Sequence, residues 1–264
     1  MTIATLCQYE DNWPTELGAV SVAEGTVTLR GLDLLNSDAT LGWLDLLFFG
    51  ITGRRFADKE LSLIQGLWKI SVSYPDPRIW NNRVAALGGS VRTTPGLAVA
   101  AAIAITDATI YGQRPMVAAF DLLQRALART ESGESLSEFV ASELRTHRGM
   151  PGYGRPIRSE DERIAPTLRL ARRLNLASGP HLKMALDIST VLKRYRLGMN
   201  IAAINAALLA DLDVSAAEYK RMAVLAFSAG FVHCEFDAAM HPEGTLFPLR
   251  CQRLHYTGPA HRAW

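Results

Sequence analysis

Cysteine is scarce in this chain, with three in 264 residues. Cys7, Cys234 and Cys251 are odd in number and lack metal-binding spacing, so the sequence predicts neither a disulfide framework nor a metal site. Sparse free thiols favour a reducing, cytoplasmic location. Cys234 falls in an apolar helical pattern, which is more typical of a small core residue than of a nucleophile.

Net charge and long apolar runs are also nearly absent. The formal charge is +2, so no overall field predicts a nucleic acid or an anionic membrane as partner. The apolar run Gly96–Ile105 is too short to span a bilayer. The first residues lack the basic and apolar regions of a secretory signal. We therefore expect neither nucleic-acid nor membrane binding.

Helical periodicity dominates what is present, and it predicts an all-α protein. One extended segment is expected at Val27–Gly31, Asp58 is the predicted N-cap of its helix, and Gly88-Gly89 is a predicted break. Leu97–Tyr111 is apolar on nearly every face and should be buried, either in the core or in a subunit interface. The expected helices are Ala39–Phe49, Lys59–Ser71, Ile79–Leu87, Leu97–Tyr111, Val117–Arg129, Leu136–His147, Ile164–Leu174, His181–Tyr195, Ile201–Leu212 and Ala216–Met240.

The most informative motif is the segment Gly149–Arg163, which joins a glycine turn to several arginines. Glycines around Tyr153 would let backbone amides approach a ligand. Arginine forks bind phosphate and carboxylate groups well. The segment therefore predicts an anion-binding site; the alternative is a solvated basic face paired with Glu160, Asp161 and Glu162.

This segment resembles the Pro-Gly-Phe-Gly-His-Pro…Asp-Pro-Arg segment of the citrate synthase family, which includes the short citryl-CoA lyases. Other pieces that resemble the family follow in the expected order across roughly residues 25 to 262. They are Gly25–Asp33, Leu44–Gly50, Trp80–Leu87, Asn200-Ile201, Gly230–Glu235, Pro248–Arg250 and Arg253–Pro259.

The resemblance implies a citrate synthase-like, all-α fold with an active-site cleft between two helical domains. The large domain would comprise residues 1–113 and 200–264, and the small domain residues 114–199. It also implies a homodimer whose partners are a coenzyme A thioester, as substrate, and an organic acid. Carried over, Arg163, Arg250 and Arg253 would bind substrate. Gly152, Tyr153, Gly154 and Arg158 would contact the coenzyme.

Two positions depart from the family pattern. Arg155 stands where the family has a catalytic histidine, and Ala202 stands where it has a catalytic carboxylate. Arginine stays charged at neutral pH and alanine accepts no proton, so no general base remains at the expected place. His233 is another candidate catalytic residue, although a structural histidine fits its helical surroundings better.

Three functions remain open after these departures. The chain is a divergent acyl-CoA transferase or lyase, a binding or regulatory protein without catalysis, or a structural subunit paired with an active relative. The retained arginines count against a purely structural role. Arg169, Arg172 and Arg173 are interpreted as ordinary helix-surface arginines.

Overall fold

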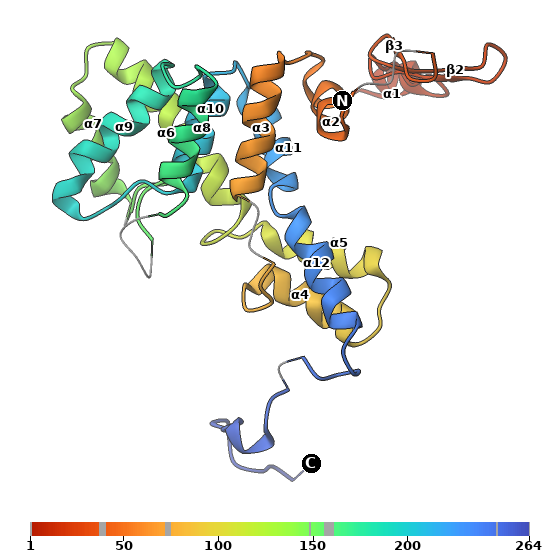
Figure 1. The fold of residues 1–264 in the computed structure, drawn as a ribbon. Helices are drawn as coiled ribbons and strands as arrows, with labels where there is room; N and C mark the ends of the chain where they lie inside the picture. Colours follow the sequence, from red (N-terminus) through yellow and green to blue (C-terminus); the bar gives the residue numbers. More distant parts are fainter. Residues whose placement is uncertain are drawn as a thin grey trace.

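The structure is a computed structural model that describes residues 2–36, 41–71, 75–147, 149–155, 161–246 and 248–263. It confirms the all-α expectation (Figure 1). The helices are α1 (Ile3–Tyr9), α2 (Trp43–Thr52), α3 (Asp58–Ser71), α4 (Trp80–Ser90), α5 (Pro95–Thr106), α6 (Gln113–Glu131), α7 (Leu136–Thr146), α8 (Ile164–Arg173), α9 (Pro180–Leu192), α10 (Ile201–Ala210), α11 (Ala216–Leu225) and α12 (Ser228–Ala239). Short 3-10 turns lie at η1 (Lys193–Tyr195) and η2 (Cys251–Arg253).

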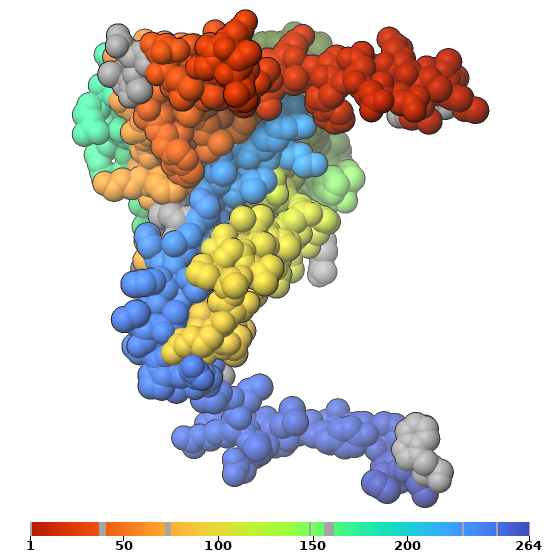
Figure 2. Space-filling model, turned by 90° about the vertical axis from the view of Figure 1, so that its right-hand side faces the viewer, coloured from red at the N-terminus to blue at the C-terminus, as the bar shows by residue number. Residues whose placement is uncertain are grey.

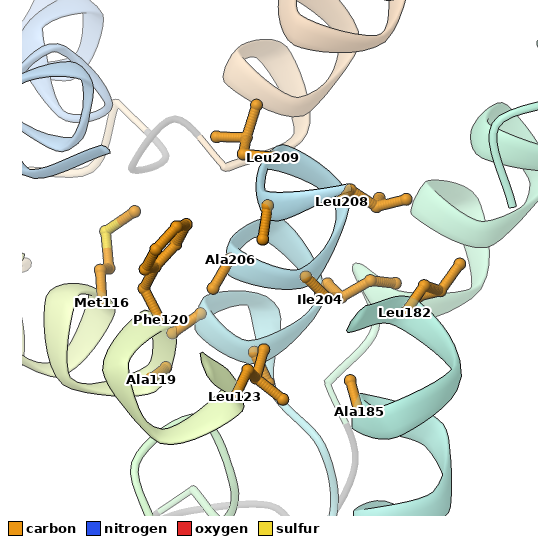
Figure 3. Close-up of a cluster of buried hydrophobic side chains, with 14 of the residues drawn as sticks. Met116, Ala119, Phe120, Leu123, Leu182, Ala185, Ile204, Ala206, Leu208 and Leu209 are labelled. Carbon is orange, nitrogen blue, oxygen red and sulfur yellow. The ribbon is translucent and has the colours of Figure 1, made fainter. Parts of the chain in front are cut away.

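The main body is built around α10, whose residues Ala202–Ala210 are all buried. Alanines on this helix let α6 and α9 approach closely on either side, as Figure 3 shows around Ile204. Phe120 and Leu123 come from α6, and Leu182 and Ala185 come from α9. Large side chains from both neighbours therefore fill the space beside small ones, which gives a close-packed core.

One hydrophobic core joins helices from both predicted domains. It takes residues from α2, α3 and α11, which fall in the predicted large domain, and from α6 to α9, which fall in the small one. The predicted boundaries at 113/114 and 199/200 stay a prediction.

A second, smaller unit consists of α4, α5 and α12, which pack together away from the main body (Figure 1). The expected break at Gly88-Gly89 is wrong, because both glycines lie inside α4. A Cβ atom at Gly89 would lie 2.2 Å from the Glu235 carbonyl oxygen, and one at Gly88 would lie 2.5 Å from the Ala98 Cβ. The glycines thus permit close helix packing instead of ending the helix.

The expectation that Leu97–Tyr111 is buried is also wrong for the single chain. In α5 only Ala98, Ala102 and Thr106 are buried. Leu97 is 66% exposed, and Figure 2 shows α5 running along the surface beside α12. Ala102 packs with Ala85 of α4 and Phe231 of α12, whereas Leu97, Ile103 and Ile105 are exposed. Within one chain α5 is therefore not a core helix. Its expected role in a subunit interface stays a prediction.

The long expected helix Ala216–Met240 is divided into α11 and α12. At the break, the Leu225 carbonyl oxygen accepts hydrogen bonds from Trp68 Nε1 at 3.0 Å and from the Ser228 hydroxyl at 2.8 Å. Two side-chain donors therefore satisfy the Leu225 carbonyl at the end of α11, where backbone donors of the helix are no longer in place. Similarly, Asp58 is not the N-cap of its helix but its first residue, and Glu60 accepts the Ala57 amide.

Both ends of the chain extend away from the helical body (Figures 1 and 2). The N-terminal arm carries α1 and a three-stranded antiparallel sheet of β1 (Val20–Ser21), β2 (Thr26–Leu29) and β3 (Leu32–Asp33). The register pairs Val20 with Val27, and Thr28 with Asp33. Strand β2 confirms the extended segment expected from sequence. The C-terminal tail contains η2 and is exposed throughout its described residues.

By length and composition alone, the helical stretch Ala216–Ala239 would be able to cross a membrane. Core helices of soluble proteins pass the same test, and this stretch is two helices rather than one. Among the described residues, no group of three or more His, Cys, Asp or Glu side chains could hold a metal ion.

Candidate functional site

The glycine turn at 152–154 is docked against the segment that leads into α10. The Gly154 amide donates to the Gly198 carbonyl at 2.6 Å, and the Asn200 amide donates to the Gly152 carbonyl at 2.9 Å. The Asn200 side-chain amide adds a bond to the Gly154 carbonyl at 3.0 Å. These three hydrogen bonds hold the start of α10 against the glycine turn.

Positive φ angles and close packing explain the two glycines. Gly152 has φ +83° and Gly154 has φ +86°, both in the region that favours glycine. A Cβ atom at Gly152 would lie 2.7 Å from the Ala203 Cβ, which belongs to α10. Since the Tyr153 and Gly154 amides already donate to carbonyls, ligand contacts at Gly152, Tyr153 and Gly154 stay a prediction.

Tyr153 anchors the turn in the core. Its hydroxyl donates to the Ala185 carbonyl on α9 at 2.9 Å, and its side chain is buried. Burial raises the pKa of this hydroxyl well above its usual range, so Tyr153 stays protonated. Its chemistry here is that of a neutral hydrogen-bond donor.

We expect Tyr153→Phe to lower the free energy of unfolding by about 1–2 kcal/mol, because a buried hydrogen bond is lost. Tyr219→Phe is the matched control. The Tyr219 hydroxyl is equally buried but has no hydrogen-bond partner among the described residues, so its removal should change stability little. Urea unfolding of both variants checks the difference. Equal losses of stability would show that the Tyr153 bond does not hold the turn.

Asp161 organises the charges beside the turn. Its side chain is fully buried and accepts Arg163 Nε and Nη2 at 2.8 Å each, the Arg163 amide at 3.1 Å, and the Ile201 amide at 2.9 Å. Burial would raise the pKa of Asp161, but the bonds and charge of Arg163 outweigh it and lower the pKa. Asp161 is therefore an anion at the N-terminus of α10, where the helix dipole favours negative charge.

Arg155 extends this network toward solvent. Its Nη1 donates to Glu162 Oε2 at 2.6 Å and lies 3.9 Å from Asp161 Oδ1. The bond from Arg155 lowers the pKa of Glu162. The two arginines and two carboxylates alternate, so the predicted pairing of this face with acidic residues is present for Arg155 and Arg163. The Arg155 side chain is 29% exposed, which leaves it open to solvent on one side.

A cavity of about 670 Å³ opens beside this network, between α8 and α9. Its walls are mainly apolar, and two cations, Lys193 and Arg196, reach it from the turn after α9. Arg196 has φ +58°, an uncommon conformation for a residue with a side chain. Asp161 also lines the cavity, together with Ile164, Ala165, Leu168, Leu186, Ser189, Leu197, Gly198 and Met199.

Sequence reasoning missed Lys193 and Arg196. The available signal was the run Lys-Arg-Tyr-Arg, directly before the Leu-Gly-Met-Asn segment that leads into α10. The expected helix His181–Tyr195 concealed it, because α9 ends at Leu192 and the cations lie on a 3-10 turn.

The fold of the chain has counterparts among solved structures. Citryl-CoA lyase from Hydrogenobacter thermophilus gives a TM-score of 0.83 at 19% identity, over 96% of this chain and 97% of that chain. A mutant ATP citrate lyase from Methanosaeta concilii, solved with (3S)-citryl-CoA, gives 0.77 at 16% identity, over 98% of this chain and 45% of that chain. Citrate synthase from Thermoplasma acidophilum gives 0.65 at 13% identity, over 97% and 62% of the respective chains.

The chain has a citrate synthase-like fold. This confirms the fold that its motifs predicted, and at such low identity the likeness concerns the fold. No protein-family model matches the chain, and no curated protein matches it by sequence.

Within this citrate synthase-like fold, the predicted site residues fall into two groups. Arg155, Arg163 and the glycine turn lie together at the start of α10. His233 is exposed on α12, and Arg250 and Arg253 are exposed on the C-terminal tail, apart from that group in the single chain (Figure 1). Arg158 lies outside the described residues. The roles predicted for these residues stay predictions.

Ala202, the position of the expected carboxylate, is the second residue of α10 and is buried. The Asp161 carboxylate lies close to this position, because it accepts the neighbouring Ile201 amide. Because Asp161 accepts four hydrogen bonds and its pKa is lowered, it is poorly suited to take a proton. The expected lack of a general base stays a prediction.

Cys234 does not supply an alternative nucleophile beside His233. Its side chain is buried, and burial raises the pKa of its thiol to about 11. The thiolate that a nucleophilic cysteine needs is therefore scarce at neutral pH. The expected free thiols are confirmed, with Cys7 and Cys251 exposed.

Proposed function

We propose that the chain binds a coenzyme A thioester and a carboxylic acid in and beside the cavity between α8 and α9. The observation that carries this proposal is the combination of an apolar cavity with two cations, Lys193 and Arg196. Coenzyme A complements this cavity, because its negative phosphates match the two cations and its long pantetheine arm matches the apolar walls. No carboxylate of the described residues forms an ion pair with either cation, so both are available for phosphate.

The acid would bind next to this cavity at Arg155. Glu162 now occupies one face of that guanidinium, and its side chain is 46% exposed. A ligand carboxylate is able to replace Glu162 there, because the same charge-assisted bond is kept. Arg163 would not contact the acid in this binding mode. Its bonds to Asp161 hold that carboxylate at the N-terminus of α10.

Two chemical outcomes follow from this binding mode. In the first, Arg155 polarises a carbonyl and a residue from elsewhere supplies the base, which gives a divergent acyl-CoA transferase or lyase. In the second, the chain binds coenzyme A and an organic acid without turnover, as a regulatory or binding subunit. Ala202 and the saturated hydrogen bonding of Asp161 favour the second outcome.

A homodimer is part of the proposal. The large apolar side chains of α5 and α12 are exposed on adjoining surfaces, including Leu97 at 66% and Phe236 at 65%. Apolar surface of this kind favours association over exposure to water. In such a dimer the tails with Arg250 and Arg253 have a second subunit to reach.

We expect coenzyme A to bind to the purified chain, and Lys193→Gln with Arg196→Gln to weaken it by roughly tenfold or more, since each loses a charged contact. Arg194→Gln is the matched control, because Arg194 stacks over Tyr195 and does not line the cavity. Calorimetric titration measures all three, on protein whose dimeric mass is checked by light scattering. Absence of heat at millimolar coenzyme A would remove the proposal.

A further inference from the structure

A second cavity lies on the opposite face of α8, between α8 and α3, and has a volume of about 990 Å³. The two helices touch there, because Gly66 leaves room for Leu170, whose Cδ2 would lie 2.2 Å from a Cβ at that position. Leu44, Trp68 and Ile70 give the cavity an apolar floor. This groove is separate from the one beside α9.

Helical geometry explains why one helix serves two cavities. Ile164, Ala165 and Leu168 face the α9 side, whereas Arg169 and Arg173 face the α3 side. A ligand in the α3 groove would thus be held by residues that the proposed coenzyme site does not use.

The described residues that line the groove include four cations and no carboxylate: Lys69 from α3, and Arg169, Arg172 and Arg173 from α8. None of the four side chains has a hydrogen-bond or ion-pair partner among the described residues. In contrast, Arg78, Arg114, Arg125, Arg129, Arg155 and Arg163 each pair with a carboxylate.

The clustering has no sufficient explanation within the chain. Arg172 and Arg173 lie in the last turn of α8, where the helix dipole favours positive charge. That effect does not account for Lys69 on another helix, nor for Arg169, which faces Arg173 across one turn at a like-charge spacing. The sequence-based interpretation of these arginines as ordinary surface residues therefore changes once α3 is placed beside them.

We propose that the groove between α3 and α8 is a binding site for a polyphosphate anion. Several arginines and a lysine converging on one groove match a chain of phosphate groups, which offers many acceptor oxygens to several cations at once. The apolar floor at Leu44, Trp68 and Ile70 suits a flat base attached to that chain. A nucleoside triphosphate or inorganic triphosphate has the required chemistry.

Titration with inorganic triphosphate and with ATP, both in metal-free buffer, tests the site. We expect Arg169→Gln with Arg173→Gln to weaken triphosphate binding by roughly tenfold or more. Arg169→Lys with Arg173→Lys should keep most of the affinity, and binding should weaken as salt is raised. The control pair is Lys59→Gln with Lys183→Gln, two exposed lysines on α3 and α9 outside the groove. Circular dichroism verifies that each variant is folded.

The outcomes separate this site from the proposed coenzyme site. Tighter binding of ATP than of triphosphate, or equal binding, supports the site and tells whether the apolar floor holds a base. Displacement of triphosphate by coenzyme A, or equal weakening by the groove and control pairs, would overturn it. Because Lys193 and Arg196 line the cavity beside α9 and not the groove between α3 and α8, failure of one proposal leaves the other intact.

Discussion

Asp161→Ala is expected to lower the free energy of unfolding by about 3–5 kcal/mol, the range for removing one partner of a buried ion pair. The change leaves Arg163, whose side chain is only 19% exposed, without its bidentate partner. It also removes the acceptor of the Ile201 amide at the start of α10, the central helix of the core. Chemical denaturation gives the magnitude.

Asp187→Ala is the matched control, because Asp187 is an exposed carboxylate on α9. Its loss should change stability by no more than about 0.5 kcal/mol. If the two variants were equally stable, Asp161 would not organise the start of α10. The variant Asp161→Asn should fall between them, since it keeps an acceptor but loses the charge.

The same experiment has a defined pH dependence. The folded pKa of Asp161 lies below its unfolded value of about 3.9, so the stabilisation is complete above that pH. It is lost as the pH falls through the folded pKa, because protonation then removes the charge that holds Arg163. The stability difference between wild type and Asp161→Ala should therefore be constant near neutrality and shrink below about pH 4.

Restoring the proton-transfer groups should produce the largest change in activity. We expect the wild-type chain to condense acetyl-CoA with oxaloacetate feebly at most, and Ala202→Asp with Arg155→His to raise the rate by roughly 10²-fold or more, the usual contribution of a positioned base. Asp at position 202 sits in the first turn of α10, where a carboxylate is tolerated.

Ala202→Asn with Arg155→His is the matched control, because asparagine has the shape of aspartate but accepts no proton as a base. It should stay at the wild-type rate in a coupled thiol-release assay. Robust turnover by the wild-type chain would refute the inference that a base is missing. A gain shared by the Asn and Asp variants would mean that the effect is not proton transfer.

The spacing of apolar residues predicts where helices form, but it does not predict how they pack against one another. Ile164–Leu174 and Leu136–His147 were placed within a residue of α8 and α7, because their apolar spacing is strong. The predicted break at Gly88-Gly89 is wrong, because a glycine pair can either end a helix or allow another helix to pack closely. The two cases have the same sequence pattern. For Leu97–Tyr111 the sequence left a core helix and a subunit interface open, because apolarity does not say which surface covers a helix.

The sequence predicted part of the candidate site, but not the contacts within it. The segment 149–163 identified Arg155, Arg163 and the glycine turn, which the structure brings together at α10. It could not show that Asp161 accepts the Ile201 amide, because that contact spans 40 residues of chain. Lys193 and Arg196 were equally hidden, since their role depends on the cavity that α8 completes.

By itself the sequence determined the helical class, the resemblance to the citrate synthase family and the two positions, 155 and 202, that depart from the family pattern, because residue identity and spacing are local properties. Only the tertiary structure decided which charges are paired and which are free. Asp161 pairs with Arg163 and accepts the Ile201 amide from 40 residues further along the chain, whereas Lys69 and three arginines of α8 line one groove without a carboxylate among its described lining residues. Contacts such as these between α3 and α8, or between Asp161 and α10, depend on distances between segments far apart in the chain, and folding alone sets those distances.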